Sequence, residues 1–539
     1  MSLADHISRN EKRLDSKRIV TILWLGGVAF VLAYLSLVLL SRLGLPIEMA
    51  VAIIGIFMIV ASLSCGWFGR TMTSRVFFFS NRMMGIAPSG FSGCTDWLSG
   101  SFLGLLLVTS ATDRLILAPS AMIGMLLCTI LFATAFQRSN VSTVPGFLAM
   151  RYQKRRVGLV ALMFVALILS LFLFAEARLA SHLIGTMINL SQTQSLILVV
   201  VLIALPTLIG GWLALIVINA ILVVWVLICV LLPATLSGFF PGLLLNTISY
   251  QEVLNPLNQL GLMEIFGIDG VGLKSNGFFH MALAALVLSC GFACLPHALS
   301  RLTLSFHHVT VLESLGWSAL SGFLILSAFP LSIGLLALGS NAGELSVALS
   351  KQPIVQMLPV LALLLAAMNA AAVTVFALSS AIIRLMRRTR NLDPGERTMF
   401  GTRALCVVLC VGLVFLLQDY SPAIGPLFVA AICTSAGALF APLTVAIWAS
   451  RIPSWSVAMA TLFGGGATVF FLAADYFSTT SGELSNTLSA YSGFPTIYAA
   501  GIGMFVGIFI LGIGRIFALV RRSTDDDIID QLRLLSPEV

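Results

Sequence analysis

The chain has 539 residues, of which 59% are hydrophobic and only 10% are charged. Its mean hydropathy is +1.03. So much apolar surface does not fit inside a soluble core, and the composition therefore predicts an all-α integral membrane protein that crosses the bilayer many times. The formal net charge of +8 comes from Lys and Arg dispersed in short connectors, with no basic domain, which excludes a nucleic-acid-binding protein.

Apolar stretches long enough to span a bilayer as a helix, about 20 residues each, recur along the chain. We expect about fourteen transmembrane helices. They cover residues 19–43, 47–69, 87–111, 115–137, 157–187, 193–209, 211–236, 276–300, 312–339, 353–386, 402–418, 423–449, 454–474 and 495–520. The weakest boundary is the one near 210, where only Gly210 and Gly211 interrupt the apolar run.

The ends of the chain and its two long connectors are predicted to be peripheral. A tail at 1–18 precedes an extra helix at 19–43, which is too long for a signal peptide and has no small-residue cleavage site after it. The main membrane domain at 44–522 and a tail at 523–539 follow. The connectors 237–275 and 475–494 are rich in Gly, Ser and Asn, which predicts loops.

Positive charge is distributed unequally between the two sides of the predicted bundle. With the N-terminus in the cytoplasm, the opposite side receives only Arg42, Arg114, Lys274 and Lys351. The remaining Lys and Arg of the tails and connectors fall on the cytoplasmic side, which predicts that both ends of the chain are cytoplasmic.

Two apolar stretches are interrupted where an ordinary membrane helix would be uniform. Ser289–His297 reads Ser-Cys-Gly-Phe-Ala-Cys-Leu-Pro-His, and Gly90–Gly104 contains Asp96 together with several glycines. A proline frees a backbone carbonyl one turn back, and hydrocarbon tolerates such a break only where the backbone lines a cavity. The pair of interruptions therefore predicts two broken helices around a site near the middle of the membrane.

These two segments, together with Thr143–Tyr152 (TVPGFLAMRY), resemble the sodium/solute symporter family and, within it, the cation/acetate symporter-like branch. The resemblance covers about residues 47–520. It implies a LeuT-like fold of two inverted five-helix repeats, here about 87–236 and 276–449. It also implies a secondary active transporter of a small organic solute, such as the monocarboxylate acetate, in a bacterial inner membrane, with sodium or proton coupling.

The residues at the two breaks are the candidate substrate-binding residues. His297 either hydrogen-bonds a carbonyl freed by the break or lines the substrate pathway, and Asp96 suits gating better than direct contact with an anion. Arg301 is interpreted as an anchor at the end of its helix. The full set at the breaks is Asp96, Trp97, Ser99, Ser101, Gly291, Leu295, Pro296 and His297.

Glu176 and Arg178 lie inside the span predicted at 157–187. Because residues two apart on a helix face different ways, each needs its own partner or a water-filled vestibule. Glu176 stands where the acetate branch has a polar Gln, which favours a pathway role. Arg178 is a candidate for binding a carboxylate with two parallel hydrogen bonds, or for pairing with an acid on another helix.

The resemblance also implies a sodium site, as the coupling ion and not as a cofactor. The backbone carbonyls would come from Thr95 and Leu98, and two adjacent hydroxyl residues would come from the span 353–386, where the aligned residues are Leu365 and Ala366. Hard cations take oxygen ligands, so this half is degraded unless Asn369 or Thr374 supplies the oxygen.

A second hypothesis is a transporter-like membrane sensor that binds the solute and signals through a separate partner protein. An enzyme is not expected, because the sequence has no HExxH, Walker A or GxSxG motif in a suitable context, and none of its cysteines forms a CxxC pair. The expected partners are therefore the solute and the lipid bilayer, with a small membrane partner or a homo-oligomer left open.

Overall fold

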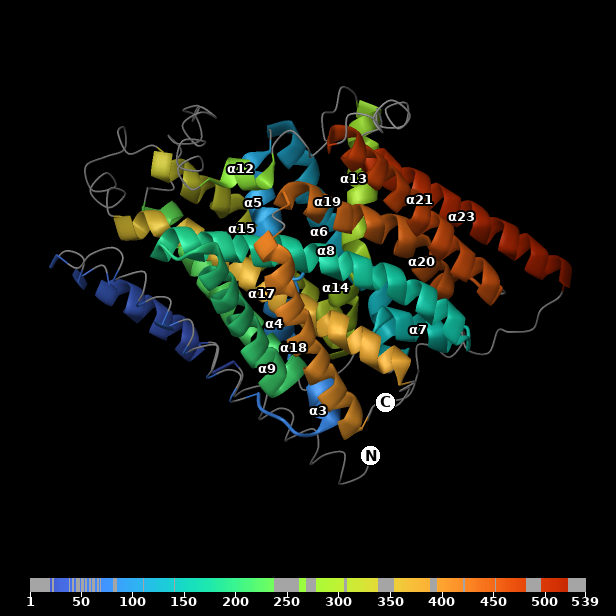
Figure 1. Ribbon diagram of the computed structural model, residues 1–539, viewed down its shortest axis with the longest axis horizontal. Helices are drawn as coiled ribbons and strands as arrows, with labels where there is room; N and C mark the ends of the chain where they lie inside the picture. The colour runs from blue at the N-terminus through green and yellow to red at the C-terminus, as the bar shows by residue number, and fades with distance from the viewer. Residues whose placement is uncertain are drawn as a thin grey trace.

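The computed structural model describes most of the chain and is entirely helical within the described residues (Figure 1). These are residues 69–80, 85–109, 111–139, 141–236, 261–267, 278–304, 308–337, 353–387, 395–419, 422–450, 452–480 and 496–521, with shorter runs between 20 and 67. Nine of the described helices are long and apolar enough to cross a membrane, or ten if one bent pair counts as a single span. The all-α membrane class is confirmed, whereas a count of fourteen is not.

The helices follow the chain in an order that the apolar stretches largely predicted. Their bounds are α3 Ser74–Phe79, α4 Ile86–Cys94, α5 Gly100–Val108, α6 Ala111–Ser139, α7 Val144–Arg151, α8 Arg155–Ile188, α9 Gln192–Leu236, α12 Leu262–Phe266, α13 Phe278–Ala293, α14 Pro296–Arg301, α15 His308–Ala337, α17 Pro353–Met386, α18 Glu396–Asp419, α19 Ile424–Ser435, α20 Ala441–Trp448, α21 Ser454–Thr480 and α23 Thr496–Arg521. A 3-10 turn, Leu302–Leu304, extends α14, and a π-helical turn, Ala436–Phe440, joins α19 to α20.

Two predicted segments differ from the structure or lie outside it. The stretch 47–69 falls mostly outside the described residues, whereas the first stretch contains the helix Trp24–Leu37. This helix stacks Phe30 on Trp225 of α9 at 5.0 Å between ring centroids. The connector 237–275 was expected to be a loop but contains the short helix α12, whose five residues are too few to produce a periodic pattern.

Both predicted helix breaks are present. The backbone leaves the helix at Thr95–Ser99, between α4 and α5, and at Cys294–Leu295, between α13 and α14. Ser99 caps α5 by accepting a hydrogen bond from Phe102 N–H at 3.3 Å, and Pro296 occupies the first position of α14, where its missing N–H is not needed. The second break bends the chain by 41°.

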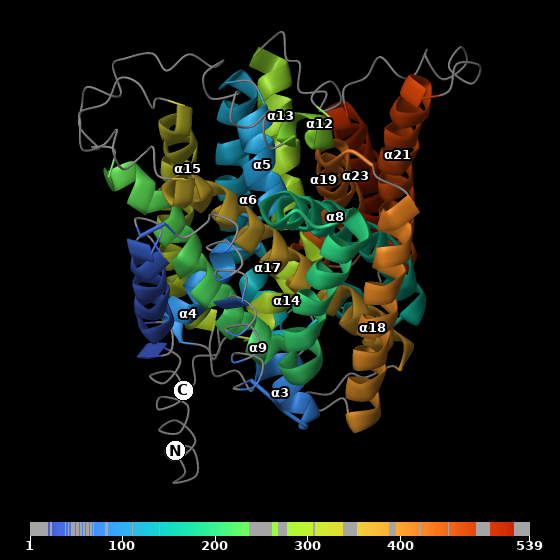
Figure 2. The ribbon, with the colours of Figure 1, turned by 60° about the vertical axis from the view of Figure 1, so that its left-hand side comes forward.

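The two breaks lie at a similar height in the bundle. In Figure 2, α5 and α13 occupy the upper half and α4 and α14 the lower half, while α8 crosses the middle. α17 packs along both α8 and α9 and is almost entirely covered by other helices, with 94% of its apolar window buried. The breaks therefore face one another near the centre of the molecule, next to α8 and α17.

Gly211 divides α9 into two helices, as the sequence predicted at its weakest boundary. Its backbone adopts φ 57° and ψ −139°, a conformation that residues with a side chain rarely adopt. A Cβ atom at this position would lie 2.6 Å from the Phe77 carbonyl oxygen, so α3 fills the kink. The division at this glycine confirms two helices in place of one.

Candidate solute and ion site

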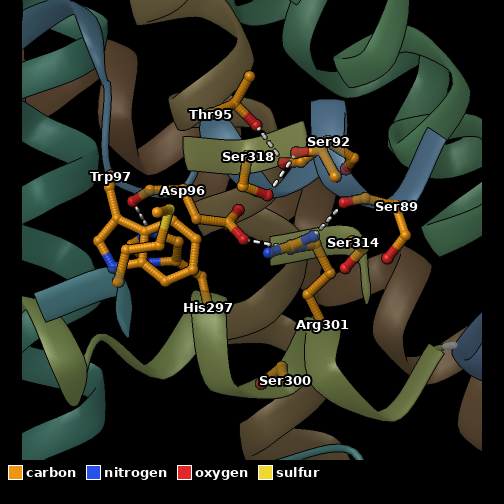
Figure 3. Close-up of polar contacts among 12 residues, drawn as sticks. Ser89, Ser92, Thr95, Asp96, Trp97, His297, Ser300, Arg301, Ser314 and Ser318 are labelled. Carbon is orange, nitrogen blue, oxygen red and sulfur yellow. Dashed lines mark hydrogen bonds and ion pairs between the residues drawn. The ribbon is translucent and has the colours of Figure 1, made fainter. Parts of the chain in front are cut away.

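A buried ion pair joins the two broken helices. The carboxylate of Asp96, in the first break, accepts a hydrogen bond from Nε of Arg301 at the end of α14 (Figure 3). Arg301 Nη1 also donates to the Ser89 carbonyl of α4 at 2.8 Å. Asp96 is 2% exposed and Arg301 8%, so neither charge is compensated by bulk water. The arginine predicted to be an anchor is instead the partner of Asp96.

His297 makes a second link between the breaks. Its Nε2 lies 3.2 Å from the backbone carbonyl oxygen of Asp96, and Trp97 Nε1 donates to the Phe292 carbonyl of α13 at 3.3 Å. Because a carbonyl only accepts, Nε2 carries the proton, and Nδ1 of the neutral ring is then an acceptor. Nδ1 is buried and has no hydrogen-bond partner. The imidazole can therefore accept a hydrogen bond from a hydroxyl or a protonated carboxyl group.

Four phenylalanines from different helices pack together next to His297. Phe102 of α5 packs edge-on against Phe292 of α13 at 5.4 Å between ring centroids. Phe172 of α8 lies 5.4 Å from Phe428 of α19 and 4.9 Å from the His297 ring. This aromatic cluster, Phe102, Phe172, Phe292 and Phe428, contacts the imidazole through Phe172 and gives the site an apolar surface beside it.

Glu176 faces the start of α5. Its two carboxylate oxygens lie 3.2 and 3.1 Å from the Ser101 backbone N–H, which donates to them, and its side chain is fully buried. The Ser99 hydroxyl and Gly100 N–H also interact with the carboxylate. A helix N-terminus attracts anions because its first N–H groups are unpaired. Here the anion at that N-terminus is a side chain of the protein itself.

Arg178 points elsewhere, as its spacing from Glu176 predicted. It lines a cavity of about 500 Å³ at the C-terminal end of α8, with His182, Asn189 and Gln192 among the polar lining residues and Ile265 of α12 on the other side. The Arg178 Nη1 atom has no hydrogen-bond partner. The cavity is therefore a polar vestibule with one unmatched guanidinium nitrogen.

The remaining residues predicted for the site shape the breaks. Ser99 is the cap of α5, Leu295 is the residue before α14, and Gly291 packs its α-carbon against the Ile432 carbonyl of α19, where a Cβ would come within 2.4 Å. Ser101 contributes its N–H to Glu176, and its hydroxyl interacts with the same carboxylate.

The two residues aligned with the hydroxyl half of the sodium site, Leu365 and Ala366, cannot coordinate a sodium ion through their side chains. Leu365 and Ala366 are buried and have no side-chain oxygen. Thr374 donates its hydroxyl to the Ala370 carbonyl of its own helix at 2.6 Å, and Thr95 donates to Ser92 at 2.7 Å. Leu98 lies in the first break, as expected, and the buried Asn369 amide has no partner. Across the described residues, no group of three or more His, Cys, Asp or Glu side chains could hold a metal ion.

Several residues of the site were not predicted from the sequence. The aromatic cluster, Ser89, and Ser318, whose hydroxyl donates to the Gly90 carbonyl at 2.6 Å, carry no motif. Asn219 of α9, buried with its whole amide unpartnered, was also missed. The pairing of Arg301 with Asp96 could have been predicted, because the two residues carry opposite charges and lie at the two predicted breaks.

Comparisons with known proteins agree with this architecture. Residues 77–465 match the sequence model of the sodium:solute symporter family. A Na+-coupled sialic acid symporter in a substrate-bound, outward-open state is 15% identical, with a TM-score of 0.56 over 88% of this chain and 98% of that one. A mutant of the Eremococcus coleocola manganese transporter is 14% identical, with a TM-score of 0.50 over 82% of this chain and 95% of that one. No curated protein matches the chain.

Proposed function

This chain belongs to the sodium:solute symporter family, and we propose that it carries a small monocarboxylate, such as acetate or pyruvate, across the bacterial inner membrane by alternating access. The family and the transporter fold support secondary transport. The solute class is inferred from the site at the two helix breaks.

One observation carries the proposal: Asp96, Arg301 and His297 tie the two broken helices together at a buried point. In an inverted-repeat transporter the first helix of each repeat moves relative to the other parts of the bundle when access alternates. A solute that binds between these helices competes with, or replaces, the contacts that hold them. Binding and movement are thereby linked at the same residues.

The shape and polarity of the site support a small solute with one polar end. The aromatic cluster offers an apolar surface, and the unpartnered Nδ1 of His297 is the polar group beside it. A short alkyl chain can pack against the rings. A neutral carboxyl group can donate a hydrogen bond to the unprotonated Nδ1, and a carboxylate can accept one from Nδ1 when the ring is protonated. Arg178 in the vestibule would attract the anion before it reaches the breaks.

Solute uptake into liposomes containing the purified protein tests the proposal. We expect uptake of radiolabelled pyruvate above that of protein-free liposomes, with competition by unlabelled acetate. The sodium and pH gradients should be imposed separately, so that each coupling ion is scored on its own. Saturable pyruvate binding without uptake under either gradient would contradict transport and favour a sensor.

A His297→Ala variant examines the site itself. Removing the imidazole should raise the pyruvate concentration for half-maximal uptake about tenfold or more, since one hydrogen bond to a charged or polar solute group is lost. Glu313 on α15 has an exposed side chain, so Glu313→Gln provides a control variant that should behave as wild type.

A further inference from the structure

We infer that Glu176 is the group that binds the coupling proton, an inference that rests on the proposed function. The carboxylate lies at the middle of α8 and at the N-terminus of α5, the half of the first broken helix that begins directly after the break. A proton at this position is bound where the moving helix and its neighbours meet.

The carboxylate is held by backbone dipoles and not by a cation. Within the described residues no Lys or Arg is recorded in contact with Glu176, and its hydrogen bonds come from the start of α5. A buried carboxylate without a counter-ion keeps its charge only at a free-energy cost, and a bound proton removes that cost. Glu176 can therefore exist in either state in the folded protein.

The charged groups nearest Glu176 along α8 and on the neighbouring helices can each be located. Arg178 and His182 of the same helix line the vestibule. Phe172, one turn earlier on α8, contacts His297, beyond which lies the Asp96–Arg301 pair. Helices α5 and α9 carry no charged side chain. The charged residue of α17 is Arg384, in its last turn. These positive charges therefore line the vestibule, pair with Asp96 or lie in the last turn of α17.

The vestibule begins close to Glu176 along α8. Glu176 precedes Arg178 by two residues, which is about 3 Å of helix rise, and the cavity of about 500 Å³ extends from Arg178 toward the end of α8. Glu176 itself is fully buried and is not among the lining residues, so a proton that enters from this side has to cross the packed side chains between the vestibule and the carboxylate.

Protonation changes how Glu176 holds α5. The ionised carboxylate accepts hydrogen bonds from the start of the helix and interacts favourably with its dipole, whereas the neutral carboxyl group loses most of that attraction. One proton from the vestibule side binds one carboxylate oxygen, α5 is released to move with bound solute, and the same proton leaves on the other side. This cycle uses no oxygen ligand at Leu365 or Ala366, which fits the loss of hydroxyls there.

The test compares Glu176→Gln with Glu313→Gln in liposomes, using pyruvate as the probe. Gradient-independent exchange of internal for external pyruvate is measured first, because its absence in the wild type would defeat the proposed function itself. Accumulation driven by an imposed pH gradient is measured next, with protein-free liposomes subtracted, together with the alkalinisation of the external medium that accompanies pyruvate entry.

In Glu176→Gln we expect pH-driven pyruvate accumulation and the coupled alkalinisation to fall at least tenfold. The pyruvate exchange that remains should be independent of pH. Glu313→Gln should match the wild type. Glu176→Asp, which keeps an acid at the position, should retain part of the coupling and guards against loss of folding in the Gln variant. If the wild type exchanges pyruvate while Glu176→Gln still accumulates it under a pH gradient, the assignment of Glu176 is wrong.

Discussion

The Asp96–Arg301 pair shows how two charges can be retained inside a membrane bundle. Each is buried, and Arg301 has a further backbone acceptor at Ser89, so its donors are not left unsatisfied when α4 and α14 meet. Burying such a pair gives little net stability, but removing one partner leaves the other charge uncompensated in a low-dielectric interior. The pair therefore acts as a link between the two breaks and not as a large source of folding free energy.

Replacing Asp96 by Asn should destabilise the protein and slow transport. The side chain keeps its size, but Arg301 is left buried without a counter-charge, which costs about 3 kcal/mol or more. We expect a lower melting temperature in detergent and a tenfold or larger loss of pyruvate uptake. Adding Arg301→Gln to the same chain removes the orphan charge and should recover part of the lost melting temperature. A single variant that melts like the wild type would show that the pair is dispensable for the fold.

At the level of residues, the sequence predicted the positions of the site better than their partners. Asp96 and His297 were found because a charge and a ring within a glycine- or proline-broken apolar stretch are rare. The partner of Asp96 is 205 residues away, and no local pattern reports such a contact. Phe172 and Phe428 could not be distinguished from ordinary core residues, because phenylalanine is common throughout the apolar stretches.

At the level of elements, the breaks depend on a few residues whose backbone requirements are strict. Pro296 begins α14, Ser99 caps α5, and Gly211 turns α9 with a positive φ. These features were predictable because proline, glycine and serine act locally on the backbone. Helix α12 was not, because its position depends on packing against α5, where Phe266 covers Gly104.

Gly211→Ala should weaken the fold through this kink. The left-handed φ strains any residue with a Cβ, by about 1–3 kcal/mol, and the new methyl group would also meet the Phe77 carbonyl. We expect a clearly lower melting temperature. Gly466→Ala on α21 is the matched comparison, since a Cβ at Gly466 meets nothing within 4 Å. Equal melting temperatures for the two variants would mean that α9 can straighten without penalty.

At the level of the whole molecule, the two repeats place their broken helices against α8 and α17. Helices α21 and α23 pack together on the side away from the helix Trp24–Leu37 (Figure 1). α8 has 34 residues, so it is about 51 Å long and exceeds the hydrocarbon thickness of a bilayer. This length allows α8 to span the bilayer even when it is tilted. Charge predicts that the first end faces the cytoplasm, because Lys154, Arg155 and Arg156 flank that end and no Lys or Arg flanks the last.

Single cysteines at the two ends of α8 test this orientation. Lys154 and Ser191 are both exposed, and the cysteines of the described chain are buried, so a new cysteine at either position should react before the native ones. We expect a membrane-impermeant maleimide to label Ser191→Cys in intact cells and Lys154→Cys only after permeabilisation, with the wild-type chain as the background. The reverse pattern would contradict the cytoplasmic placement of both chain ends. It would also place the Arg178 vestibule on the cytoplasmic side, so that the coupling proton would reach Glu176 from inside the cell.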